Sequence, residues 1–84
     1  MNNPDWLRRE NVKISLDARP LLAAGDPPLD RVIRETETFE AGAIYEIITP
    51  FVPVPMSQKM GARGFECYTE QDPEGAFHNY FCRI

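Results

Sequence analysis

Apolar and polar residues alternate with a period of two from Val12 to Asp17. This pattern is typical of a strand with one face buried. The strand ends before Pro20, because proline cannot donate a hydrogen bond to a sheet ladder. Residues 21–25 are small or apolar and have no helical periodicity of their own. We therefore predict a strand at 12–17 that leads into a proline-bearing turn.

A helical pattern follows the sequence Asp26-Pro27-Pro28. We predict Asp26 as the N-cap, because its carboxylate can accept a bond from a free N–H of the first turn. Proline is tolerated at this point, because the first N–H groups of a helix have no partner within the helix and proline lacks an N–H. Gly42 is predicted to stop the helix. The apolar stripe recurs at a spacing of three and four residues, at Leu29, Val32, Ile33, Thr36 and then Phe39 or Glu40.

The second half of the chain contains further strand and helix patterns. Residues 43–49 are rich in β-branched and aromatic residues, as strands are. Pro50, Pro53 and Pro55 exclude 50–55 from a sheet and indicate a rigid spacer. The remaining predicted elements are a helix at 56–62 that ends by Gly64, and strands at 65–71 and 76–84 joined by a turn at 72–75.

The order of these elements is β-α-β-α-β-β, which predicts an α/β (α+β) fold. Right-handed crossovers place both helices on one face of a four-stranded mixed sheet, as a two-layer sandwich. We expect residues 11–84 to form one domain and residues 1–10 to form a loose N-terminal arm. Trp6 in this arm either docks on its own chain or anchors a neighbouring chain.

The register of the last hairpin decides which side chains share a face. If Gln71 pairs with Ala76, then Cys67, His78 and Cys82 lie on the helix side with Val12. The opposite face, which no helix covers, then carries an apolar patch. Such a patch is typical of a protein interface, so we predict a two-fold homodimer. The candidate interface residues are Ile44, Ile48, Tyr68, Phe77 and Phe81.

Composition narrows the class of protein. The net charge is −4 without a basic cluster, which argues against a nucleic-acid partner. No apolar run approaches the roughly 20 residues of a membrane span, and the first ten residues lack the apolar core of a signal peptide. We therefore expect a cytoplasmic protein with reduced cysteines and no membrane partner.

The chemistry-bearing residues favour a binding protein over an enzyme. Cys67 and Cys82 are interpreted as small core residues, and no pair of candidate ligands has the close spacing of a structural metal site. His78 is expected to face solvent or to bond locally, and no catalytic triad can be assigned. We predict no metal, no cofactor and no catalytic residue.

One candidate ligand site lies where both predicted helices begin. Helix N-termini at the carboxyl edge of an open sheet suit anions. In this interpretation Arg19 and backbone N–H groups hold a small anion or a partner's acidic group. The alternative is that Arg19 pairs with an aspartate and only stabilises the turn. The candidate site residues are Asp17, Arg19, Asp26 and Thr49.

The segments SLDARP and GDPPLDRVI resemble the opening of TusA/SirA-like proteins, in particular an uncharacterised branch of that superfamily. The matching positions are Asp17, Arg19 and Pro28. The resemblance implies that the last strand lies between the second and third, antiparallel to both. Sulfur-carrier members have a cysteine in a Cys-Pro-x-Pro motif that carries a persulfide. Gly25 stands at that position here, which argues against the usual carrier mechanism.

These observations leave three hypotheses for function. The first is a non-enzymatic interaction or regulatory module that dimerises through its open sheet face. The second is a persulfide carrier or accessory that uses Cys67 or Cys82, which requires an exposed thiol with a lowered pKa. The third is an accessory protein that binds a small anion or a redox cofactor.

Overall fold

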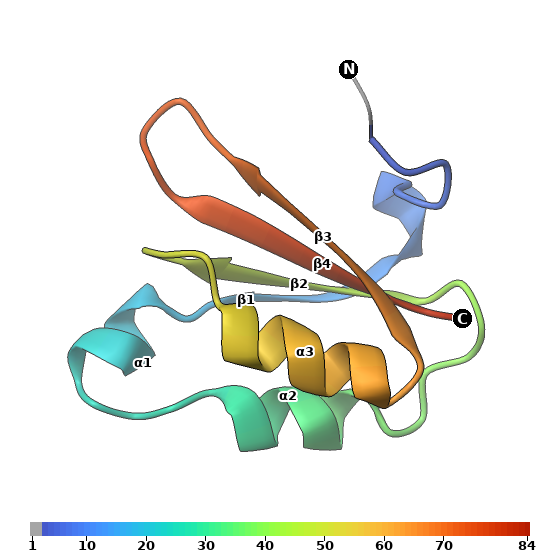
Figure 1. Ribbon diagram of the computed structural model, residues 1–84, viewed down its shortest axis with the longest axis horizontal. Helices are drawn as coiled ribbons and strands as arrows, with labels where there is room; N and C mark the ends of the chain where they lie inside the picture. Colours follow the sequence, from blue (N-terminus) through green and yellow to red (C-terminus); the bar gives the residue numbers. More distant parts are fainter. Residues whose placement is uncertain (1–2) are drawn as a thin grey trace.

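The computed structural model describes residues 3–84 and shows a four-stranded sheet with helices against one face (Figure 1). The elements, in chain order, are a 3-10 helix η1 (Arg9–Asn11), β1 (Val12–Asp17), α1 (Arg19–Ala23), α2 (Leu29–Thr36), β2 (Ile44–Thr49), α3 (Val54–Ala62), β3 (Phe65–Gln71) and β4 (Phe77–Arg83).

The strand order in the sheet is β1-β2-β4-β3. β1 and β2 are parallel, whereas β4 is antiparallel to both of its neighbours, β2 and β3. In Figure 1, α2 and α3 are both drawn below the sheet, and the N-terminal segment before β1 lies beyond its other side. The predicted two-layer arrangement, with a mixed sheet and the last strand between the second and third, is therefore observed.

The short helix α1 (Arg19–Ala23) was not predicted. The turn after β1 instead begins a five-residue helix with Pro20 in its first turn. Proline is acceptable there because the first helical N–H groups have no intrahelical partner. A single turn contains too few positions for a periodic apolar stripe, so the sequence pattern could not reveal it.

The limits of α2 differ from the predicted ones. Pro28, not Asp26, occupies the cap position, and no side chain caps the helix. The helix ends at Thr36 instead of continuing to Phe39 or Glu40. The Thr36 hydroxyl donates to the carbonyls of Val32 and Ile33. The backbone hydrogen bonds that follow connect residues three positions apart, as in a 3-10 helix. Such bonds tighten the last turn and end the helix early.

The core lies between the sheet and the helices. Tyr45 and Ile47 project from β2 into this layer, and both are fully buried. Met56 and Met60 pack against them from α3, which begins at Val54, two residues before the predicted start, and has Pro55 in its first turn. The buried residues of this main core are Ala18, Val32, Tyr45, Ile47, Met56, Met60, Phe65 and Phe81.

The hairpin between β3 and β4 corrects the predicted register by one residue. Gln71 pairs with Phe77, not with Ala76. Ala76 belongs to the loop instead, where its N–H donates to the Asp72 carboxylate and its carbonyl accepts from the Asp72 N–H. Because side chains alternate across a strand, this shift exchanges the two faces of β4.

The exchange moves Phe77 and Phe81 from the predicted outer interface to the helix side. Phe81 is fully buried in the main core. Phe77 shares its strand face with Phe81, by alternation along β4. His78 and Cys82 move to the outer face, so they no longer share a side with Cys67, which packs against the main core.

The outer face of the sheet is covered in part by the N-terminal segment. Trp6 and Leu7 pack against a buried cluster that contains Ile44, Tyr80 and Cys82. Val12 also belongs to this outer cluster, because the pairing of β1 with β2 shifts register between Val12 and Ile14. Trp6 therefore docks on its own chain, which is the first of the two interpretations given above.

Candidate functional site

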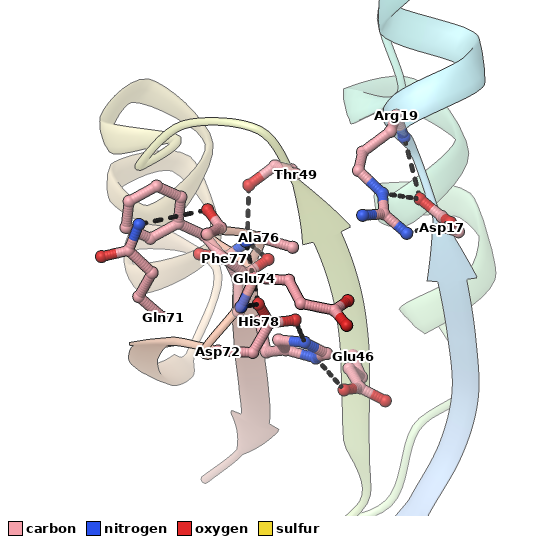
Figure 2. A network of polar contacts seen from close by, with 12 residues as sticks. Asp17, Arg19, Glu46, Thr49, Gln71, Asp72, Glu74, Ala76, Phe77 and His78 are labelled. Atoms are coloured by element: carbon pink, nitrogen blue, oxygen red, sulfur yellow. Dashed lines mark hydrogen bonds and ion pairs between the residues drawn. The ribbon is translucent and has the colours of Figure 1, made fainter.

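A polar cluster occupies the outer face near the carboxyl end of β2, and its centre is His78 (Figure 2). The Nδ1 atom of His78 lies 2.9 Å from Oε2 of Glu46, in β2. Its Nε2 atom lies 2.9 Å from Oδ2 of Asp72, in the hairpin turn. The imidazole ring therefore bridges two carboxylates from different elements.

Electrostatics in this cluster favours the charged form of all three groups. The hydrogen bonds to Glu46 and Asp72 raise the pKa of His78 above its ordinary 6.5. The bond from His78 lowers the pKa of Asp72. Burial acts to raise the pKa of Glu46, but hydrogen bonds, chiefly from His78, outweigh it and leave that pKa below 4.5.

Glu46 is the least accessible member of the cluster, with only 7% of its side chain exposed. The Ser15 hydroxyl of β1 donates to its Oε1 atom at 2.9 Å. Arg9 approaches the same oxygen at 4.0 Å, but its own side chain is 79% exposed. His78 is consequently the principal neutralising group for a buried carboxylate.

The predicted pair Asp17 and Arg19 lies beside this cluster and forms a forked ion pair. Nε and Nη2 of Arg19 donate to the two carboxylate oxygens of Asp17 at 2.9 and 2.8 Å. The bond from Arg19 lowers the pKa of Asp17. Both side chains are more than two-fifths exposed, so solvent screens the pair and it contributes little to the stability of the fold. Arg19 thus already has a carboxylate partner, as in the alternative in which it pairs with an aspartate and stabilises the turn.

The other two predicted ligand residues lie elsewhere. Thr49 is buried on the helix side, where its hydroxyl donates to the Phe51 carbonyl at 2.6 Å and accepts from Nδ2 of Asn79 at 3.0 Å. Asp26 lines an open groove of about 350 Å³ between α1 and α2, together with Arg31 and Arg34. The structure therefore does not bring the four predicted ligand residues into one site.

The predicted interface residues are also divided. Ile44, Ile48 and Tyr68 lie on the outer face as expected, whereas Phe77 and Phe81 lie on the inner one. Ile44 is fully buried beneath the N-terminal segment. Tyr68 stacks on Tyr80, and its hydroxyl donates to Asn3. The outer face is consequently less apolar and less open than the sequence indicated.

The segment after β2 carries three of the four exposed large apolar side chains of residues 3–84. Phe51, Val52 and Val54 are 50%, 49% and 52% exposed. Pro53 between them is buried and anchors the loop. The bond from Thr49 to the Phe51 carbonyl and one from the Val54 N–H to the Val52 carbonyl fix its backbone. We call residues 51–54 the apolar loop, although Val54 is also the first residue of α3.

The cysteines do not form a reactive centre. Cys67 and Cys82 are both free thiols, and within residues 3–84 no group of three candidate ligands could hold a metal ion. Burial raises the pKa of Cys67 to about 11 and also raises that of Cys82. These shifts count against a persulfide carrier, which needs a lowered thiol pKa. Gly25, at the position of the carrier cysteine, has φ +77°, a conformation that a cysteine adopts only with strain.

We expect thiol reagents to modify the folded protein slowly. Since a pKa near 11 instead of 9.0 leaves about a hundredfold less thiolate, Cys67 should react about a hundredfold more slowly than in the urea-unfolded chain. Mass spectrometry of the protein after timed alkylation at pH 8 measures this rate at each site. Rapid native labelling of either cysteine would contradict this expectation and favour the carrier hypothesis.

Sequence reasoning missed Glu46 and Asp72 as partners of His78. One signal was present: Glu46 is the only charged residue of the strand IYEIIT. A charge in a strand of this apolar composition is buried only when it is paired. The identity of its partner depended on the hairpin register, which the sequence left open.

Fold and site together define a small mixed α/β two-layer protein with a bridged histidine and a protruding apolar loop. None of the helices within residues 3–84 combines the length and hydropathy needed to cross a membrane. Comparisons with protein-family models, with curated proteins and with solved structures found no significant match.

Proposed function

We propose that this chain is a non-enzymatic protein-interaction module, and that the apolar loop is its contact surface. The observation that carries the proposal is the half-exposure of Phe51, Val52 and Val54 on a backbone held by Pro53 and Thr49. Exposed apolar groups on a preorganised loop lose little conformational entropy on binding. Contiguous exposed apolar surface is typical of protein-binding sites.

Charge around the loop indicates the kind of partner. Thr49, immediately before the loop, pairs with Phe77, immediately after the hairpin turn. This pairing places the hairpin turn, with Asp72 and Glu74, at the same end of the sheet as the apolar loop, in a chain of net charge −4. We therefore propose a protein partner with an apolar cleft that is bordered by Lys or Arg, because complementary charge favours encounter and orientation.

The finer classification belongs to the same proposal. The position of β4 between β2 and β3 supports a TusA/SirA-like fold, because that resemblance implies this strand order. The two free thiols fit a reducing compartment, so we propose a cytoplasmic location. A homodimer remains the alternative to a different partner protein, and the following experiment distinguishes them.

A photo-cross-linking amino acid at position 51 should yield one discrete adduct in native cells. The matched control is the same group at position 84, because Ile84 is also apolar and is 75% exposed. This control should yield no adduct. Excess unlabelled wild-type protein should compete for the partner and suppress the adduct. The same excess of an unlabelled Val52→Asp variant should not suppress it. Added salt should weaken it.

Equal adducts at positions 51 and 84, or an adduct that Val52→Asp also suppresses, would contradict a specific contact at the apolar loop. An adduct of twice the mass of this chain would identify a second copy as the partner. That outcome would indicate a homodimer that forms through the apolar loop, in place of a basic partner protein.

A further inference from the structure

We propose that His78 is a proton-operated clamp, which holds the hairpin turn of residues 72–76 against the outer face of β2. His78 is the single histidine of the sequence. The clamp is a property of the fold and does not depend on the proposed interaction function.

With Glu46 and Asp72 both ionised, the geometry favours the imidazolium form. Both ring nitrogens of His78 lie 2.9 Å from a carboxylate oxygen, one from Glu46 and one from Asp72. A neutral imidazole carries one N–H, so it can donate to only one of these oxygens. The other nitrogen would then present a lone pair to a negatively charged oxygen. Both contacts are attractive only when the ring is protonated.

The clamp acts on the turn through Asp72. While Oδ2 of Asp72 contacts His78, its Oδ1 atom accepts from the backbone N–H groups of Glu74 and Ala76 at 2.9 and 3.0 Å. The orientation of one carboxylate therefore sets both the turn and its attachment to the sheet. At the other end, Glu46 is a buried carboxylate that is costly to leave without a partner.

The other groups around His78 do not replace it. The Ser15 hydroxyl, and Arg9 at 4.0 Å, contact Glu46 only through Oε1, the oxygen that His78 does not use. The Tyr80 hydroxyl also hydrogen-bonds to Glu46, but it carries no positive charge. Further charged groups near the ring are Glu70, which is opposite His78 on β3, Asp17 at the end of β1, and Arg19, which is already paired with Asp17. The negative groups outnumber the positive ones, and this surplus favours a proton on His78.

The direction of the pH dependence follows from these contacts. The pKa of His78 is raised above 6.5, so its stabilising effect is complete below pH 6.5 and is lost as the pH rises through the raised value. The pKa values of Glu46 and Asp72 are lowered from 4.5 and 3.8, so their effect is present above those values and is lost on acidification. The clamp should be tightest between about pH 4.5 and 6.5.

Nitrogen-15 NMR of the wild-type protein tests the clamp directly. At pH 6 both ring nitrogens of His78 should be protonated, and the ring should titrate above its ordinary 6.5. Amide exchange at Glu74 and Ala76, divided by the intrinsic rate, should accelerate as the ring loses its proton. The acceleration should be about tenfold for each unit by which the His78 pKa exceeds 6.5.

Two variants complete the test. His78→Gln should abolish the pH dependence of exchange at Glu74 and Ala76 between pH 6 and 9. Asp17→Asn is the matched control, because it removes a carboxylate from the same face that makes no bond to His78, and it should keep the dependence. A neutral, single-tautomer ring at pH 6, or turn exchange that stays constant while the ring titrates, would overturn the proposal.

Discussion

Replacing Phe81 with alanine is expected to lower the free energy of unfolding by about 3–5 kcal/mol. Phe81 is fully buried between the sheet and the helices, where Tyr45 lies opposite it on β2. Truncation removes the ring from the core and leaves a cavity that close-packed neighbours fill only partly. A domain of 84 residues has a total stability of roughly 4–13 kcal/mol. The variant should therefore be largely unfolded at a modest concentration of urea.

Urea denaturation followed by circular dichroism measures this loss. The matched control is Phe51→Ala, because Phe51 is 50% exposed and its truncation should change stability by less than about 0.5 kcal/mol. The comparison also tests the hairpin register. If Phe81 lay on the outer face, as the sequence indicated, the two substitutions would have similar small effects.

The second large effect is expected for Asn79→Ala, at about 2–3 kcal/mol. Asn79 is fully buried on the helix side of β4. Its amide donates to the carbonyl of Ile47 at 2.9 Å and to the hydroxyl of Thr49, and its oxygen accepts from Thr69 at 2.7 Å. Alanine would remove all three of these bonds, and water cannot easily replace the ones that lie inside the core.

Thermal unfolding of Asn79→Ala and Thr69→Ala separates this network from simple packing. Thr69 is only half-buried and makes one of the bonds, so its variant should lose about 1 kcal/mol. Asn79→Ala should also loosen the apolar loop, since Thr49 holds the Phe51 carbonyl. Equal stability of Asn79→Ala and the wild type would show that the buried amide contributes nothing.

The layers of the fold were predictable because each depends on local patterns. Alternation marked β1, and proline and glycine marked the limits of the elements that follow. Right-handed crossovers then left few ways to arrange the helices. The same local signals failed for α1, which is too short for a period, and for the end of α2, where Thr36 bonds back to the helix.

The candidate site was predictable only in part. The pairing of Arg19 with Asp17 was one of the stated alternatives, because the two residues are only two positions apart in the sequence. The bridge between Glu46 and Asp72 joins residues that are far apart in the chain, and it forms only in one register of the hairpin. A shift of one residue turns His78 from the helix side to the outer face.

The amino-acid sequence alone determined the order of the four strands and the two longer helices, the single mixed sheet and the acidic, proline-rich character of this protein. Its periodicities and turn residues act over a few positions, so they do not need the rest of the fold. Tertiary structure decided which face of β4 meets the helices, where Trp6 packs and which carboxylates His78 bridges. The physical reason is that Asp72 draws Ala76 into the loop through its own hydrogen bonds, and this single residue of register assigns every side chain of β4 to its side.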